Sequence, residues 1–144
     1  MDASPIRILV VEDSEMDFEL LTATLARQGV VADCLRVEDR ESMQRLLSGG
    51  GFDAVISDHN LPRFSSTQAL EVLKASGQVL PFLIVSGTIG EEAAVAAMRA
   101  GADDYLTKGS LGRLGGSLGG APAAAGARRE RAAAELALQE SEQR

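Results

Sequence analysis

Short runs of aliphatic and β-branched residues recur five times along the chain, and a stretch whose apolar residues have helical spacing follows each run. This alternation, with short links between the runs, predicts a parallel sheet covered by helices on both faces. The third run is apolar almost throughout, as expected for a central parallel strand without a solvent-exposed face. The predicted strands cover residues 6–11, 32–37, 54–57, 80–85 and 104–107.

Helix start and stop signals flank the intervening stretches. Ser14 and Asp39 are predicted N-caps, and Thr88 followed by Glu91 resembles a capping box. Glycine suits the position after a helix because it tolerates the left-handed conformation that ends the last turn. Such glycines are Gly29, Gly77, Gly101 and those of the run from Gly49 to Gly51.

The fifth helical stretch is unusual. Leu111, Leu114 and Leu118 keep an apolar stripe, but seven of the fifteen glycines lie between Gly109 and Gly126. Each glycine inside a helix costs about 1 kcal/mol relative to alanine. We therefore predict a short, irregular last helix that still docks its stripe on the sheet.

Composition restricts the classes of function. The chain has 144 residues, enough for one domain, and its 21 acidic and 14 basic side chains give a net charge of -7. Nucleic-acid binding is not expected, because phosphate neutralisation needs clustered basic residues. The single cysteine, Cys34, excludes an internal disulfide and suits a reducing compartment. The sequence has no signal-peptide pattern and no apolar run of membrane-spanning length, which predicts a soluble, cytoplasmic protein.

The composition changes after Pro122, where Ala, Arg, Glu and Gln begin to dominate. We therefore divide the chain into a folded domain at residues 1–120 and a helical extension at residues 121–144. Two interpretations of the extension remain: a solvated tail, or the start of a helical linker into another domain.

Functional side chains follow four of the predicted strands. Glu12 and Asp13 follow the first strand and Asp58 ends the third. Ser86 and Lys108 follow the fourth and the fifth. The carboxyl ends of neighbouring parallel strands open on one edge of the sheet, where ligands of such sheets bind. The carboxylates there suit Mg²⁺, with Asp13 and Asp58 as direct ligands and Glu12 acting through a water.

A cation, an ammonium and a hydroxyl in one crevice suit phosphoryl transfer, which depends on positioning and on neutralising charge. The metal would hold one phosphoryl oxygen, Lys108 the second and Ser86 the third. Asp58, at the centre, would be the nucleophile and form an aspartyl phosphate. The metal and Lys108 would both keep its carboxylate ionised.

The chain resembles the receiver domains of response regulators, of the chemotaxis-regulator type, over about residues 6–118. The acid pair, the aspartate, the hydroxyl and the lysine match that family in order. Residues 58–62 resemble its phosphoacceptor segment, which implies that the Asn60 carbonyl is a further metal ligand. Residues 99–108 resemble its fifth-strand signature. The resemblance implies a flavodoxin-like (βα)5 sheet with strand order 2-1-3-4-5.

The resemblance also implies a function, that of a phosphoacceptor module in a two-component or phosphorelay system. A phosphoryl group on Asp58 would draw Ser86 towards it, and Tyr105 would turn inward. The surface around residues 91–100 would then change its affinity for partners. Implied partners are a histidine kinase or histidine phosphotransfer protein, and a downstream output domain or protein. A second copy of the chain, bound through the fourth helix and fifth strand or through the C-terminal helix, is a further implied partner.

Beyond its own phosphotransfer and dephosphorylation, the domain is not expected to be an enzyme. The alternative is a pseudo-receiver, a phosphorylation-independent module for protein interaction or dimerisation; the intact crevice residues argue against it. Too few aromatics are available for a flavodoxin-like electron carrier. Tyr105 has an alternative role as an edge aromatic packed on the sheet. Residues 85–94 resemble receivers of hybrid or sensor-linked proteins, which favours an N-terminal receiver of a larger protein.

Three departures from the family pattern stand out. Ser65 and Ser66 replace the usual Asp-Gly, so the loop before the third helix is expected to differ in shape. Gly109 replaces the proline that commonly follows the lysine, and we predict a trans bond because a cis bond costs a non-proline residue about 2.5–4 kcal/mol. His59, the only histidine, lies in a loop rather than on an exposed helix, which argues against a phosphohistidine.

Overall fold

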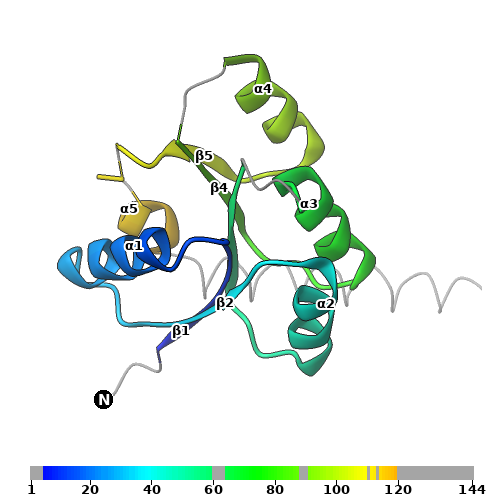
Figure 1. The fold of residues 1–144 in the computed structure, drawn as a ribbon, viewed down its shortest axis with the longest axis horizontal. Helices are drawn as coiled ribbons and strands as arrows, with labels where there is room; N and C mark the ends of the chain where they lie inside the picture. Colours follow the sequence, from blue (N-terminus) through cyan, green and yellow to red (C-terminus); the bar gives the residue numbers. More distant parts are fainter. Residues whose placement is uncertain (1–4, 60–63, 88–90, 110, 113, 120–144) are drawn as a thin grey trace, which may run out of the picture.

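The computed structural model describes residues 5–59, 64–87, 91–109, 111–112 and 114–119. These residues form one parallel sheet of five strands in the order β2-β1-β3-β4-β5 (Figure 1), which confirms the predicted flavodoxin-like fold. The strands are β1 (Ile6–Val11), β2 (Ala32–Val37), β3 (Ala54–Asp58), β4 (Phe82–Ser86) and β5 (Asp104–Thr107).

Helices cover both faces of the sheet. Helices α1 and α5 lie on one face and α2, α3 and α4 on the other (Figure 1), and their side chains pack in the core layers of those faces. The helices are α1 (Glu15–Arg27), α2 (Arg40–Gly49), α3 (Ser66–Ala75), α4 (Glu91–Ala100) and α5 (Leu114–Gly119). None of the described helices has the length and apolar character that crossing a membrane would require.

Strand alternation divides the core into two layers. Because successive side chains of a strand point to opposite faces, Val10 and Ile56 lie in the layer shared with α1 and α5. Their neighbours Val11 and Val55 lie in the layer shared with α2 and α3. Every residue of β3 is buried, as the unbroken apolar run predicted for a central strand.

Two of the predicted caps are confirmed. The Ser14 hydroxyl accepts a hydrogen bond from the Asp17 amide at 3.2 Å, and Asp39 caps α2. A capping box that was not predicted lies at α3, where the side chains of Ser65 and Gln68 each accept a hydrogen bond from the other residue's backbone amide. Ser65 stands in one of the two positions where the family usually has Asp-Gly, so this departure supplies a helix cap. The capping box predicted at residues 88–91 lies largely outside the described residues.

The short last helix is confirmed within the described residues. α5 has six residues, and Leu114 and Leu118 are fully buried against the sheet. Leu111 precedes the helix and is partly buried in the same layer. The Gln28 side chain, at the end of α1, donates to the Leu111 carbonyl at 2.8 Å and accepts from the Gly115 amide. Side-chain bonds from α1 therefore hold the start of a helix whose own sequence favours it weakly.

The remaining differences are local. β4 begins at Phe82 rather than at residue 80, although Leu80 is buried, and β3 extends to Asp58. The Lys108–Gly109 bond is trans, as predicted, since the described residues contain no cis bond. The extension at residues 121–144 lies outside the described residues.

Replacing Leu118 by alanine should destabilise the domain by about 2–5 kcal/mol, because it removes a fully buried side chain that the short helix contributes to the core. Leu20→Ala is the matched control: this leucine is 48% exposed and should cost well under half as much. Urea unfolding followed by circular dichroism measures both changes. Equal losses would show that α5 contributes no more to stability than a surface side chain.

Candidate functional site

The sheet register brings the predicted strand ends together. Asp58 lies opposite Val85, so Ser86 extends one residue further along the neighbouring strand. Ser86 itself lies opposite Thr107, which places Lys108 one step beyond that pair. On the other side of β3, Val11 pairs with Ser57, so Glu12 follows level with Asp58. The four functional residues thus lie within two residues of the same level, as expected at the carboxyl ends of parallel strands.

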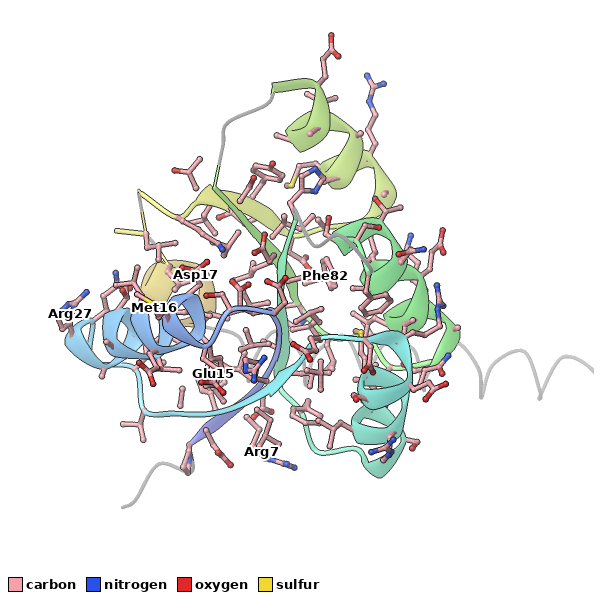
Figure 2. The ribbon with its side chains drawn as sticks, in the orientation of Figure 1. Arg7, Glu15, Met16, Asp17, Arg27 and Phe82 are labelled. Atoms are coloured by element: carbon pink, nitrogen blue, oxygen red, sulfur yellow. The ribbon has the colours of Figure 1, made fainter. Side chains whose placement is uncertain are left out.

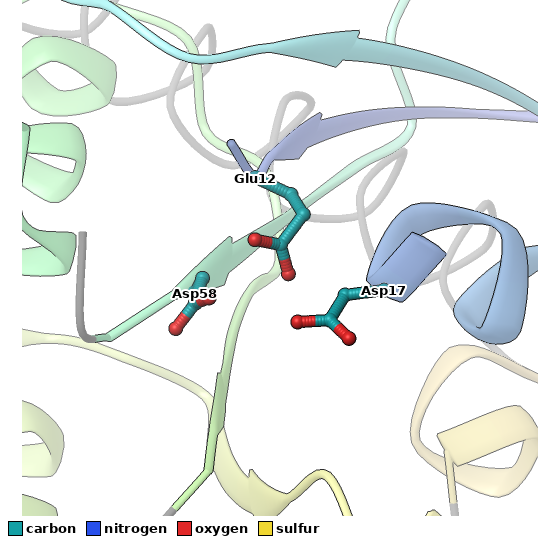
Figure 3. Close-up of side chains that lie close together, drawn as sticks. All are labelled: Glu12, Asp17 and Asp58. Atoms are coloured by element: carbon teal, nitrogen blue, oxygen red, sulfur yellow. The ribbon is translucent and has the colours of Figure 1, made fainter. Parts of the chain in front are cut away.

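Alternation along the strands gives Glu12, Asp58 and Lys108 a common face. Each lies two residues after a member of the layer covered by α1 and α5. A fourth charged group reaches the same place from the helix, since Asp17 lies on the first turn of α1 (Figure 2). Its carboxylate, with those of Glu12 and Asp58, points into one small space (Figure 3), and oxygens of the three lie within 4.8 Å of one another.

The Lys108 ammonium binds all three carboxylates. Its Nζ lies 3.0 Å from Glu12 Oε1, 2.8 Å from Asp58 Oδ2 and 2.5 Å from Asp17 Oδ2. Ionised donors and acceptors make the stronger class of hydrogen bond, and this group joins β1, β3, β5 and α1. A cavity of about 20 Å³ adjoins it, which is room for one water or ion.

Burial governs the charge state of this cluster. The Glu12 and Asp58 side chains are 7% and 8% exposed. The pKa of Glu12 is raised to about 7. Burial is the main cause and the nearby Asp58 adds to it, while the hydrogen bond from Lys108 opposes the rise. Burial also opposes the charge on Lys108, but hydrogen bonds to Asp17, Asp58 and Glu12 outweigh it and raise the pKa of the ammonium. One ammonium therefore faces an excess of acidic groups.

The other predicted site residues occupy different positions. Asp13 is exposed and is not in the carboxylate cluster. Ser86 is fully buried, and its carbonyl accepts from the Lys108 amide at 2.7 Å. The Tyr105 side chain packs against the layer shared with α2 and α3, and its ring meets that of His59 edge to face at 5.8 Å. Asn60 lies outside the described residues.

Asp17 was not among the predicted site residues. Its position in the sequence does not indicate a site, because acidic residues are common in the first turn of a helix, where they interact favourably with the helix dipole. The available signal was its spacing: the first turn of α1 follows the acid pair directly, so it starts at the edge where the crevice opens. Only the packing of α1 against the sheet shows that the third residue of the helix reaches Lys108.

Comparison with known proteins gives one family. The family model of the response regulator receiver domain matches residues 8–114 of this chain. Response regulator MprA of Mycolicibacterium vanbaalenii is 35% identical over 104 residues, which are 72% of this chain and 44% of that protein. Transcriptional regulatory protein TcrA of Mycobacterium tuberculosis is 33% identical over 105 residues, 73% of this chain and 41% of that protein. The chain thus spans less than half the length of these relatives.

Solved structures agree with the fold. A response regulator receiver protein from Pseudomonas putida has a TM-score of 0.68 at 25% identity, covering 82% of this chain and 98% of that one. The receiver domain of the histidine kinase CKI1 from Arabidopsis thaliana, complexed with Mg²⁺ and BeF₃⁻, has a TM-score of 0.64 at 26% identity, covering 78% of this chain and 87% of that one.

The raised pKa of Glu12 predicts a pH effect on stability in metal-free buffer. The folded state holds the Glu12 proton more tightly than the unfolded state, in which this carboxyl has a pKa near 4.5. The contribution of Glu12 to the stability of the fold therefore declines as the pH rises from about 4.5 to about 7. The Glu12→Gln variant has no proton to lose at this position. Its stability relative to the wild type should therefore increase as the pH rises across that window. Thermal unfolding at pH 5 and pH 8 measures the difference. Glu41→Gln, on the exposed side of α2, is the control; an equal pH response in both variants would contradict the assignment.

Proposed function

Because the chain belongs to the response regulator receiver domain family of two-component systems, we propose that it is a phosphoacceptor module, phosphorylated on Asp58 with the help of Mg²⁺. The observation that carries this proposal is the environment of Asp58. It ends the central strand, is nearly buried, and binds the ammonium of Lys108 beside a second carboxylate. A buried carboxylate that is hydrogen-bonded to an ammonium at the end of the central strand is placed as a nucleophile for phosphoryl transfer.

The donor set fits a magnesium ion. Oxygen ligands from carboxylates suit this cation, and three carboxylates with one ammonium leave an excess of negative charge for it to neutralise. Glu12 and Asp58 would hold the ion from within the cluster. Asp13 would hold it from the exposed side, with the Asn60 carbonyl as the further ligand that the family implies. When bound, Mg²⁺ supplies positive charge to the phosphoryl oxygens.

The chain's own residues perform the remaining chemistry. An Asp58 carboxylate oxygen attacks the phosphorus of a phosphohistidine, the P–N bond breaks, and its electron pair leaves with the imidazole. The Lys108 ammonium lies 2.8 Å from Asp58 and would neutralise one phosphoryl oxygen. The Ser86 hydroxyl would donate to another. The product is an aspartyl phosphate, and the protein catalyses no reaction beyond its own phosphorylation and dephosphorylation.

Phosphorylation would act on partners through Ser86 and Tyr105. The two residues lie on neighbouring strands, and Tyr105 lies on the face of β5 that packs towards α2, α3 and α4. Movement of Ser86 towards the phosphoryl group would let Tyr105 turn inward and alter the surface of α4 and β5. Val95 and Met98 expose 49% and 44% of their surface on α4, which supports this face as the one that meets a partner.

The proposed partners are those of a signalling relay. A histidine kinase or histidine phosphotransfer protein would supply the phosphoryl group in the cytoplasm. An output domain or separate protein would read the altered surface, and a second copy of the chain is the further candidate for the face of α4 and β5. The match covers 41% of TcrA, so the interpretation that this chain is the receiver of a longer protein agrees with the length of that relative.

Incubation with acetyl phosphate and Mg²⁺ tests the proposal. Intact mass measurement should show the gain of one phosphoryl group in the wild type and none in Asp58→Asn. Asp53→Asn is the matched control, since Asp53 lies just before the same strand and accepts a hydrogen bond from the Arg7 amide at the opposite edge of the sheet. This variant should be labelled like the wild type.

If the wild type, folded and saturated with Mg²⁺, gains no mass, the proposed phosphorylation is wrong. The alternative function, a phosphorylation-independent interaction module, would then be favoured. Equal labelling of Asp58→Asn and wild type would reject Asp58 as the acceptor.

Replacing Lys108 by methionine should separate metal binding from phosphoryl transfer. The variant loses the ammonium that stabilises the transferring group, so labelling should slow by roughly a hundredfold. It also leaves three carboxylates without their internal cation, so Mg²⁺ should bind more tightly. Titration calorimetry and labelling kinetics measure the two effects. Weaker Mg²⁺ binding in Lys108→Met would contradict the competition between ammonium and metal.

A further inference from the structure

We propose that Asp17 is a positioning residue for phosphoryl transfer, which holds the Lys108 ammonium on the α1 side of the crevice while Asp58 is phosphorylated. The proposal rests on the function proposed above and adds a residue from outside the strand ends. Asp17 would not touch the phosphoryl group; it would act through Lys108.

The contact geometry carries this inference. Asp17 Oδ2 lies 2.5 Å from Lys108 Nζ, the shortest of the three carboxylate contacts that the ammonium makes. Asp17 is also the most exposed of the three, at 39% against 7% for Glu12 and 8% for Asp58. The ammonium is therefore bound between two buried carboxylates and one at the mouth of the crevice.

This arrangement has a consequence when Asp58 is modified. A phosphoryl group on Asp58 takes one of its oxygens, and a cation on the acid cluster competes with Lys108 for Glu12 and Asp58. Asp17 is then the carboxylate left to bind the ammonium. Because Lys has a long flexible stem, an anchor beside the crevice keeps its charge within reach of the phosphoryl oxygens.

Helix capping does not account for the side chain of Asp17. The backbone amide of Asp17 donates to Ser14 Oγ at 3.2 Å, so the capping bond uses its amide and leaves its carboxylate to bind Lys108. Glu15, in the same turn, gives the contrast. Its carboxylate is 81% exposed and lies 3.5 Å from Arg36, away from the ammonium. Both acids lie in the first turn of α1, but of the two only Asp17 contacts Lys108.

The ammonium signal of the metal-free protein gives a test that needs no phosphorylation. Lys74 and Lys108 are the only two lysines, so lysine-selective ¹⁵N labelling gives two Nζ signals that Lys108→Met assigns. Asp17→Asn should shift or broaden the Lys108 signal and leave that of Lys74 in place. Glu15→Gln removes the same charge from the same turn and should change neither.

The rate of phosphorylation tests the positioning role. Asp17→Asn should slow phosphorylation by acetyl phosphate about three- to tenfold at saturating Mg²⁺, the size expected for a partly exposed charge-assisted bond. Glu15→Gln should keep the wild-type rate. In the Lys108→Met background, Asp17→Asn should have no further effect, because its action passes through the ammonium.

Two results would overturn the inference. The first is a Lys108 signal in Asp17→Asn that matches the signal in Glu15→Gln. The second is an equal loss of rate from Asp17→Asn with and without Lys108, which would make Asp17 act independently of the ammonium. Failure of the wild type to be labelled would instead count against the proposed function, because the ammonium signal is measured without a phosphodonor.

Discussion

The Lys108 ammonium neutralises carboxylates that three separate elements bring to one edge of the sheet. Glu12 comes from the end of β1, Asp58 from the end of β3 and Asp17 from α1. Without a cation these groups would repel one another at a site where burial already disfavours their charge. The ammonium thus offsets this repulsion, from a strand end that is remote in sequence.

The same ion pairing explains how a structural contact can become a functional one. Coulombic attraction between Lys108 and the acids is balanced against the cost of removing them from water. An arrangement near this balance can exchange one cation for another at small net cost. A divalent ion and a phosphoryl group would together take over what Lys108 does alone, with the ammonium moving from a carboxylate to a phosphoryl oxygen.

The strands and the family could be predicted from the sequence, because both depend on patterns that are local or repeated. The resemblance to that family then implied the sheet order. The convergence of Glu12, Asp58 and Lys108 followed from their place at the ends of parallel strands. The part played by Asp17 could not be predicted in this way, since it depends on how α1 packs on the sheet. For the same reason, the bond between Gln28 and the start of α5 was not foreseen. Residues 60 and 88–90 are outside the described part of the chain, so expectations on them stay predictions.

A crystal structure of the chain grown with Mg²⁺ and beryllium fluoride would show whether Lys108 exchanges Asp58 for a phosphoryl-like group. We expect a fluoroberyllate group on Asp58 and a cation beside Glu12. We also expect that Lys108 Nζ leaves Asp58 for a fluorine atom and keeps its contact with Asp17. An unchanged ion pair between Lys108 and Asp58, with no ligand bound at saturating concentrations, would contradict this exchange.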